Sequence, residues 1–103
     1  MTLRPRQAAA AEQARDMAEA GIGLECDGSP DYTRAARGLG ALLAGEEVAT
    51  DDRADVVAAL LEWCNGESDD LEGGRVTPDV RRVARETLEA GCALWARLLK
   101  AWN

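Results

Sequence analysis

Apolar residues recur three and four positions apart along four stretches of the chain, which is the spacing of one buried face on an α-helix. The predicted helices cover residues 6–20, 30–44, 51–64 and 78 to the C-terminus. The last helix carries the longest apolar stripe, from Val80 to Trp102. These patterns predict an all-α fold in which residues 1–103 form a single domain. We expect a small bundle of about four helices, mostly antiparallel, with a long C-terminal helix.

The ends of these helices are predicted from capping residues and glycines. Ser29 and Thr50 are the expected N-caps, because their hydroxyl groups accept hydrogen bonds from free N–H groups of the first turn. Gly21 and Gly66 are expected to end the helices that precede them, Gly21 in the left-handed conformation. The segment GESDDLEGG, residues 66–74, is therefore predicted to be a loop.

The composition predicts a thin hydrophobic core. Leu, Ile and Val together make 19 of the 103 residues, there is no Phe, and 20 residues are Ala. The alanines favour helix, and Trp63, Trp95 and Trp102 each supply a large apolar surface to bury. The alanine face of the first helix requires either a neighbour at close range or a place at the protein surface. Gly38 and Gly40, inside the second helix, indicate either close packing or a bend.

A thin core also favours stabilisation by a second copy or by another protein. Trp95, Leu98 and Trp102 share one face near the end of the last helix, which is about 37 Å long if straight. If that end projects from the domain, the three residues form an apolar strip suited to self-association, as in a homodimer or an adaptor subunit. In the alternative interpretation, both Trp rings belong to the core.

Negative charge is concentrated in the third helix and its flanks. The chain has a net charge of −7, and residues 46–72 carry −9 while the remainder carries +2. Arg53 is the one basic residue of this segment, against ten acids: Glu46, Glu47, Asp51, Asp52, Asp55, Glu62, Glu67, Asp69, Asp70 and Glu72. We expect these carboxylates to form a continuous acidic surface that attracts a basic protein and repels nucleic acid.

A purely structural interpretation of the acids stays open. Asp51, Asp52 and Asp55 fall in the first turns of a helix, where carboxylates offset the positive end of the helix dipole. The GESDDLEGG segment has the composition of an ordinary solvated loop. The dipole, however, leaves Glu46, Glu47 and the acids of the predicted loop unexplained.

Residues that perform catalysis or hold cofactors are scarce. The chain has no His, and its three Cys are 38 and 28 residues apart, so zinc-binding patterns and nucleophiles activated by His are absent. There is no phosphate-binding GxxxxGK loop, and the acidic segment does not match the spacing of a calcium-binding EF-hand. We therefore expect no enzyme activity, no metal and no cofactor. No stretch reaches the length and apolarity of a membrane helix or a signal peptide, so a cytoplasmic protein is expected.

One enzyme family supplies an alternative. The acids of DRAD at 52–55 and of ESDD at 67–70 are similar to the carboxylate pairs of all-helical nucleotide pyrophosphatases of the MazG type. In that family the carboxylates hold Mg²⁺ on the phosphates, so the resemblance implies a magnesium-dependent nucleotide hydrolase. The first pair has Asp where the family has Glu, and the second falls in the predicted loop.

The sequence favours a protein that acts by binding. The leading hypothesis is a small acidic interaction protein that blocks or regulates a basic partner, itself a nucleic-acid-binding protein or complex. One concrete form is a phage-encoded inhibitor of a host defence complex that imitates nucleic-acid charge. The 11 Arg against one Lys are typical of a GC-rich bacterial genome or its phage. The arginines of the fourth helix, Arg81, Arg82 and Arg85, are expected to pair with acids of this chain instead of binding nucleic acid directly.

Overall fold

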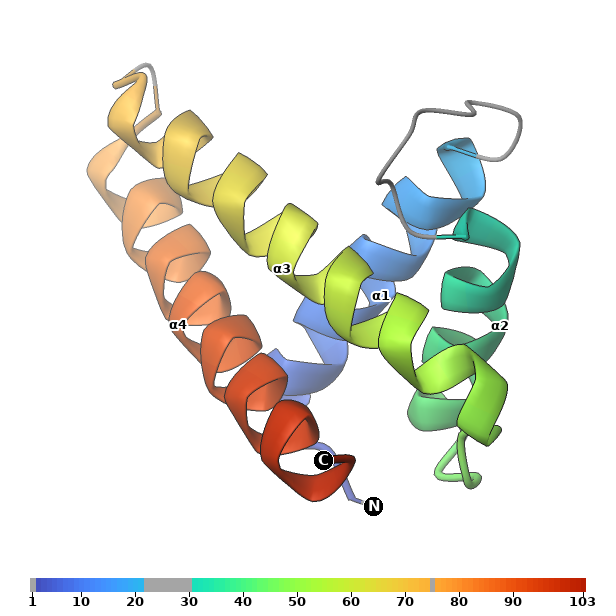
Figure 1. Cartoon of the computed structure of the whole chain (residues 1–103). Coiled ribbons are helices and arrows are strands. Elements are labelled where there is room, and N and C mark those ends of the chain that lie inside the picture. The colour runs from blue at the N-terminus through green and yellow to red at the C-terminus, as the bar shows by residue number, and fades with distance from the viewer. Residues whose placement is uncertain (1, 22–30, 75) are drawn as a thin grey trace.

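The computed structural model describes residues 2–21, 31–74 and 76–103. Its elements are α1 (Pro5–Ala20), α2 (Tyr32–Leu43), α3 (Thr50–Glu72) and α4 (Pro78–Ala101). These four helices pack against one another, and the all-α bundle predicted from the sequence is confirmed (Figure 1). α3 and α4 are long and run antiparallel, joined by the short connection 73–77. None of the helices in the described ranges is long and apolar enough to cross a membrane.

Helix α1 contacts each of the other three helices, as α3 also does. Its buried face consists entirely of alanine: Ala10, Ala11, Ala14 and Ala18. Because a methyl group fills little space, neighbouring helices approach the backbone of α1 closely. The alanine face is thus a site of close packing, one of the two alternatives that the sequence left open. α2 and α4 lie on opposite sides of α1 and do not contact each other within the described residues (Figure 1).

Larger apolar side chains around α1 supply most of the buried surface. They come from the other three helices: Leu39 and Leu42 of α2, Val56, Leu60 and Trp63 of α3, and Leu94 and Leu98 of α4. Full burial of one such side chain stabilises the fold by about 1.5–3 kcal/mol, whereas an alanine methyl contributes much less. The core is therefore built from few large residues, as the composition predicted.

Some predicted helix ends differ from the observed ones. Gly21 ends α1 as expected, but with right-handed backbone angles, φ −81° and ψ −7°. Ser29 lies outside the described residues, and the N-cap observed for α2 is Asp31, whose carboxylate accepts a hydrogen bond from an N–H of the first turn. Thr50 is the first residue of α3 and makes no capping hydrogen bond. The spacing of residues therefore locates these helices well and their exact ends less well.

The largest correction concerns the predicted loop at residues 66–74. α3 continues through Gly66 and ends only at Glu72. A glycine costs a helix roughly 1 kcal/mol relative to Ala, a cost that does not end α3 at this position. The true turn is confined to the connection 73–77, where Gly74 adopts a φ of 77°. The acids of GESDDLEGG are consequently carried by a helix and not by a loop.

Glycine allows close contacts at two helix interfaces. A Cβ atom on Gly38 would overlap with a methyl group of Val56 in α3, and one on Gly91 would overlap with the Trp63 ring. Gly38 therefore serves close packing of α2 on α3 and not a bend. Gly40, by contrast, has open space where its Cβ would lie.

An ion pair with a buried carboxylate fixes α2 to α3 beside this contact. The guanidinium of Arg37 donates two hydrogen bonds to the carboxylate of Asp52, Nη2 to Oδ1 at 2.7 Å and Nε to Oδ2 at 2.9 Å. The Asp52 side chain is 2% exposed, whereas Arg37 is 63% exposed and covers the carboxylate from the solvent side. The hydrogen bonds from Arg37 lower the pKa of Asp52, against an opposing effect of burial. The pair therefore holds Asp52 in its charged form.

Two glycines in the same helix provide a matched test of the packing. Gly38→Ala should destabilise the protein by about 1–3 kcal/mol, because the new methyl group has no room against Val56. Gly40→Ala should stabilise it by about 0.5–1 kcal/mol, because alanine favours helix and this position is open. Urea unfolding of both variants measures the two changes. Effects of equal sign would show that α2 does not approach α3 in this way.

The Arg37–Asp52 pair predicts a pH dependence of stability. Because the pKa of Asp52 is lower in the folded protein than its ordinary value of 3.8, the pair stabilises the fold above that pH. This contribution is lost as the pH falls through the folded pKa. Asp52→Asn should therefore lower the melting temperature at pH 7, with the difference from wild type shrinking below pH about 4. A difference that stays constant down to pH about 2 would contradict this account.

Candidate functional site

The ten acids predicted to form one surface fall into three groups along α3. Three lie at or before its first turn and form the N-terminal acid group: Glu46, Glu47 and Asp51. Three lie between the other two groups, from the first turn of α3 to its middle: Asp52, Asp55 and Glu62. Four lie in its last two turns and form the C-terminal acid group: Glu67, Asp69, Asp70 and Glu72. From Asp51 to Asp70, α3 rises about 28 Å, so the two end groups are well separated.

The middle three acids bind α2. Asp52 is occupied by Arg37, and its burial removes it from the exposed acidic surface that the sequence predicted. Asp55 accepts a hydrogen bond from the backbone N–H of Asp31 at 2.9 Å, and Glu62 accepts one from the hydroxyl of Tyr32 at 3.3 Å. The acidic surface predicted along α3 therefore loses Asp52, whereas Glu62 stays exposed and Asp55 stays partly exposed. The carboxylates in its middle attach the first turns of α2 to α3.

The N-terminal acid group lies where the helix favours negative charge. Asp51 is exposed in the first turn of α3, near the positive end of the dipole. Glu47 lies 3.9 Å from Arg53, measured from Oε1 to Nη2. The same arginine donates a hydrogen bond to the carbonyl of Val48, and its guanidinium lies over the Trp102 ring at 5.5 Å. The helix dipole thus offers a structural reason for Asp51, and the neighbouring Arg53 offers one for Glu47.

The C-terminal acid group lies where the helix disfavours negative charge. Each carboxylate near the negative end of a helix dipole costs about 0.3–1 kcal/mol. No described Lys or Arg side chain forms an ion pair with any of the four acids. Burial and, secondly, the Asp70 carboxylate raise the pKa of Glu67. These four charges therefore destabilise the fold, and no ion pair with a described residue offsets the loss.

The arginines at the start of α4 do not neutralise this group. The closest approach of Arg82 to a carboxylate is to Asp79 of its own helix, at 3.9 Å. Arg81, Arg82 and Arg85 line a shallow hollow on α4 together with Val76. Glu86, four residues after Arg82 on α4, pairs with Arg6 of α1. The expected pairing of these arginines with the acids of α3 is not seen among the described residues.

The tryptophan strip predicted for self-association is not an exposed strip. Leu98 is fully buried, and Trp95 and Trp102 are partly buried against the core. The guanidinium of Arg53 covers one face of Trp102. The C-terminal end of α4 therefore packs on the start of α3 instead of projecting, as in the core interpretation of the two Trp rings.

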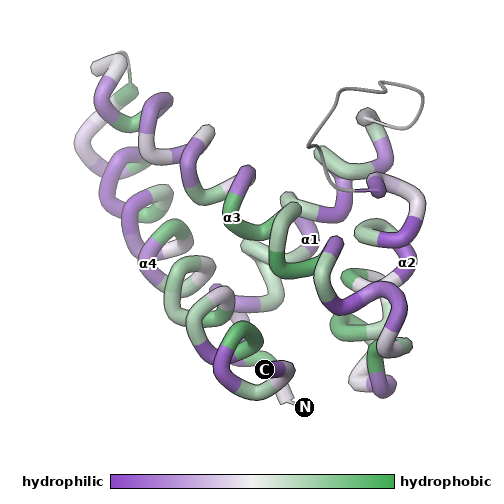
Figure 2. Tube along the Cα trace, viewed as in Figure 1, coloured by the Kyte–Doolittle hydropathy of each residue, from purple (hydrophilic) through white to green (hydrophobic). Residues whose placement is uncertain are grey.

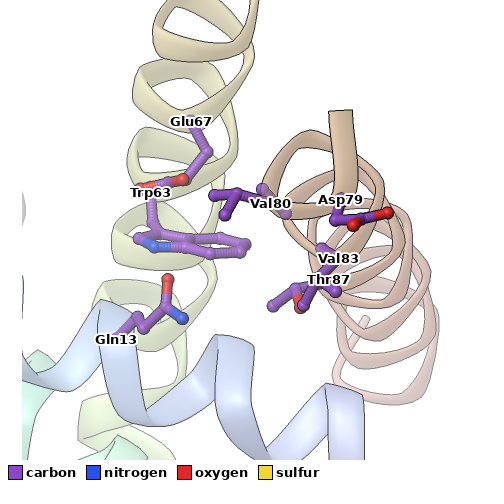
Figure 3. Close-up of a pocket in the computed structure, with 8 residues that line it drawn as sticks. Gln13, Trp63, Glu67, Asp79, Val80, Val83 and Thr87 are labelled. Carbon is purple, nitrogen blue, oxygen red and sulfur yellow. The ribbon is translucent and has the colours of Figure 1, made fainter. Parts of the chain in front are cut away.

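A groove between α3 and α4 was not predicted from the sequence. It has a volume of about 440 Å³ and is lined mainly by Trp63, Val80, Val83, Ala84 and Thr87, with Gln13 of α1 at one side and the carboxylates of Glu67 and Asp79 at its rim. Figure 3 shows the Trp63 ring between Gln13 and Glu67, with the α4 side chains across from it. We call this feature the α3–α4 groove. The apolar stripe on α4 was visible in the sequence, but which part of it stays uncovered depends on where α1 lies.

The geometry bears on the magnesium and cysteine chemistry suggested by the sequence. The acid pairs at 52–55 and 67–70 are about 22 Å apart along α3, so they do not converge on one ion. Across the described ranges, no three His, Cys, Asp or Glu side chains are grouped as a metal ion would require. Burial and the neighbouring Cys92 raise the pKa of the Cys64 thiol to about 12, which keeps it protonated at neutral pH.

Comparison of the chain with protein-family models, curated proteins and solved structures gave no match.

The same substitution at the two ends of α3 tests the energetic difference between the acid groups. Asp51→Asn should destabilise the protein by about 0.5 kcal/mol, because it removes a charge that favours the helix start. Asp70→Asn should stabilise it by a similar amount, about 0.5 kcal/mol, because it removes a charge that opposes the helix end. Both differences, measured by urea unfolding, should shrink at high salt. Equal signs would refute the dipole account of these acids.

Proposed function

We propose that this protein is a small acidic binding protein that docks exposed carboxylates of α3 on a basic protein partner and so blocks or regulates it. The observation that carries the proposal is the C-terminal acid group. Its four carboxylates oppose the helix dipole, and no described base pairs with them. Where a sequence works against its own fold in this way, a functional requirement is the usual reason.

The charges are placed for a long-range role. The last turns of α3, which are mostly hydrophilic in Figure 2, lie at the end of the α3–α4 pair that extends beyond α1 and α2 (Figures 1 and 2). Three of the four acids, Asp69, Asp70 and Glu72, are exposed there. Exposed charges of one sign accelerate encounter with an oppositely charged surface and favour one orientation of docking.

In its narrower form, the proposal identifies the partner as a nucleic-acid-binding protein. Such proteins carry Lys and Arg arranged to contact phosphates, and a set of carboxylates on a rigid helix offers them the same charge. The protein would then act as an inhibitor that competes with nucleic acid, for example one encoded by a phage against a host defence complex. Its net charge of −7 disfavours its own binding to nucleic acid.

Capture of partners from a bacterial lysate tests the proposal. The tagged protein should retain a basic protein at about 0.05 M salt and lose it at about 0.5 M, because salt screens exposed charges. A variant with Asp69→Asn, Asp70→Asn and Glu72→Gln should bind the identified partner about tenfold more weakly, at about 0.5 kcal/mol for each exposed charge. Nucleic acid should compete with the protein for that partner.

A second triple variant provides the matched control. Glu12→Gln, Asp16→Asn and Glu89→Gln remove three exposed acids from α1 and α4 and change the net charge by the same amount. This control should retain the partner almost fully, whereas equal losses in both triple variants would show a response to net charge and no defined site. Capture that is insensitive to salt would overturn the proposal itself.

A further inference from the structure

One face of α4 is covered along half of its length and open along the other half. In the C-terminal half this face is buried through Gly91, Leu94 and Leu98. About two to three turns before Gly91, the same face carries Val80 and Val83, which are 55% and 54% exposed. α1 reaches α4 at Gly91, where its Ala10 lies close, and Gln13 is the α1 residue that borders the open half.

The open half of this face forms one wall of the α3–α4 groove. Val80, Val83, Ala84 and Thr87 follow the spacing i, i+3, i+4 and i+7, which is the stripe that a helix presents to another helix. Trp63 and Glu67, one turn apart on α3, form the opposite wall (Figure 3). From Val80 to Thr87 the helix rises about 10 Å, so the groove accommodates two turns of a partner helix.

Charge around the groove selects its occupant. Glu67 lies on the α3 wall and forms no ion pair with a described base, and Asp79 lies on the α4 wall, 3.9 Å from Arg82 of its own helix. In a symmetric dimer the groove would face a second copy of itself, which brings the same acidic residues to the contact. A basic occupant pairs with Glu67, whereas a second copy of this chain adds further negative charge.

We infer that the α3–α4 groove binds an amphipathic, basic helix of a partner protein. Apolar side chains at helical spacing enter between Trp63 and the α4 stripe, and flanking Lys or Arg side chains meet Glu67 and Asp79. This inference rests on the proposed function and names the contact that accompanies the acidic surface. The Asp69 and Asp70 carboxylates, at the same end of α3, extend the contact to basic residues beyond the groove.

Two peptides of equal composition test the inference. The probe is a peptide of about 14 residues, four helical turns, with Leu at helical spacing and Lys elsewhere. Its isomer has the same residues rearranged so that no apolar face forms. In titrations followed by NMR of the isotopically labelled protein, the amphipathic probe should shift the Trp63 indole and the amides of Val80, Val83 and Thr87. It should bind about tenfold more tightly than the isomer.

Two variants of equal net charge distinguish binding in the groove from general electrostatic attraction. Val83→Glu places a carboxylate in the apolar wall and should weaken binding of the probe about tenfold. Leu61→Glu changes an exposed apolar residue of α3 that does not line the groove, and this variant should bind as wild type does. A double variant, Glu67→Lys with Asp79→Lys, should prefer a peptide with Glu in place of Lys. Circular dichroism confirms that each variant is folded.

Three outcomes would overturn the inference. Equal affinity for the probe and its isomer, with shifts confined to Asp69, Asp70 and Glu72, would show binding by charge alone and leave the proposed function standing. If the NMR signals of groove residues shift with protein concentration in the absence of peptide, the groove binds a second copy of the chain. If neither peptide binds while capture of the partner stays sensitive to salt, the binding role of the groove is rejected. The binding role proposed for the acidic surface then still stands.

Discussion

The close approach of α1 to the other three helices is the constraint on which the rest of the structure depends. An alanine face has little apolar surface of its own to bury. It stabilises the fold by letting the large side chains of α2, α3 and α4 pack close to the backbone of α1. Gly38 and Gly91 extend the same principle to the contacts of α2 with α3 and of α4 with Trp63. A chain poor in large apolar residues thus forms a continuous core.

This arrangement also decides which surfaces the fold uses. α2 is attached to α3 by small-residue packing and by hydrogen bonds to carboxylates, of which that of Asp52 is buried. At the far end of the α3–α4 pair, carboxylates oppose the helix dipole and valines remain exposed. A groove lies open there between the two helices, bordered by Gln13 of α1. The surfaces proposed for binding therefore lie at one end of the helix pair.

The acidic segment shows how one composition acquires different roles. Asp52 and Asp70 are both aspartates of α3, yet one is buried under an arginine and the other is exposed near the helix end. The Arg37 hydrogen bonds lower the pKa of Asp52, whereas burial and Asp70 raise the pKa of Glu67. The local environment, not the count of acids, separates a structural carboxylate from a candidate binding one.

The sequence by itself determined the elements, because helix periodicity and caps are local properties of the chain. It identified four helices, a thin core and a strongly acidic segment. Only the structure showed that α3 continues through Gly66, although residues 66–74 have a local preference for a loop. It also decided that Asp52 is buried and that Val80 and Val83 are exposed. These outcomes depend on contacts with distant residues such as Arg37 and Ala10, and an apolar stripe does not reveal which of its parts another helix will cover.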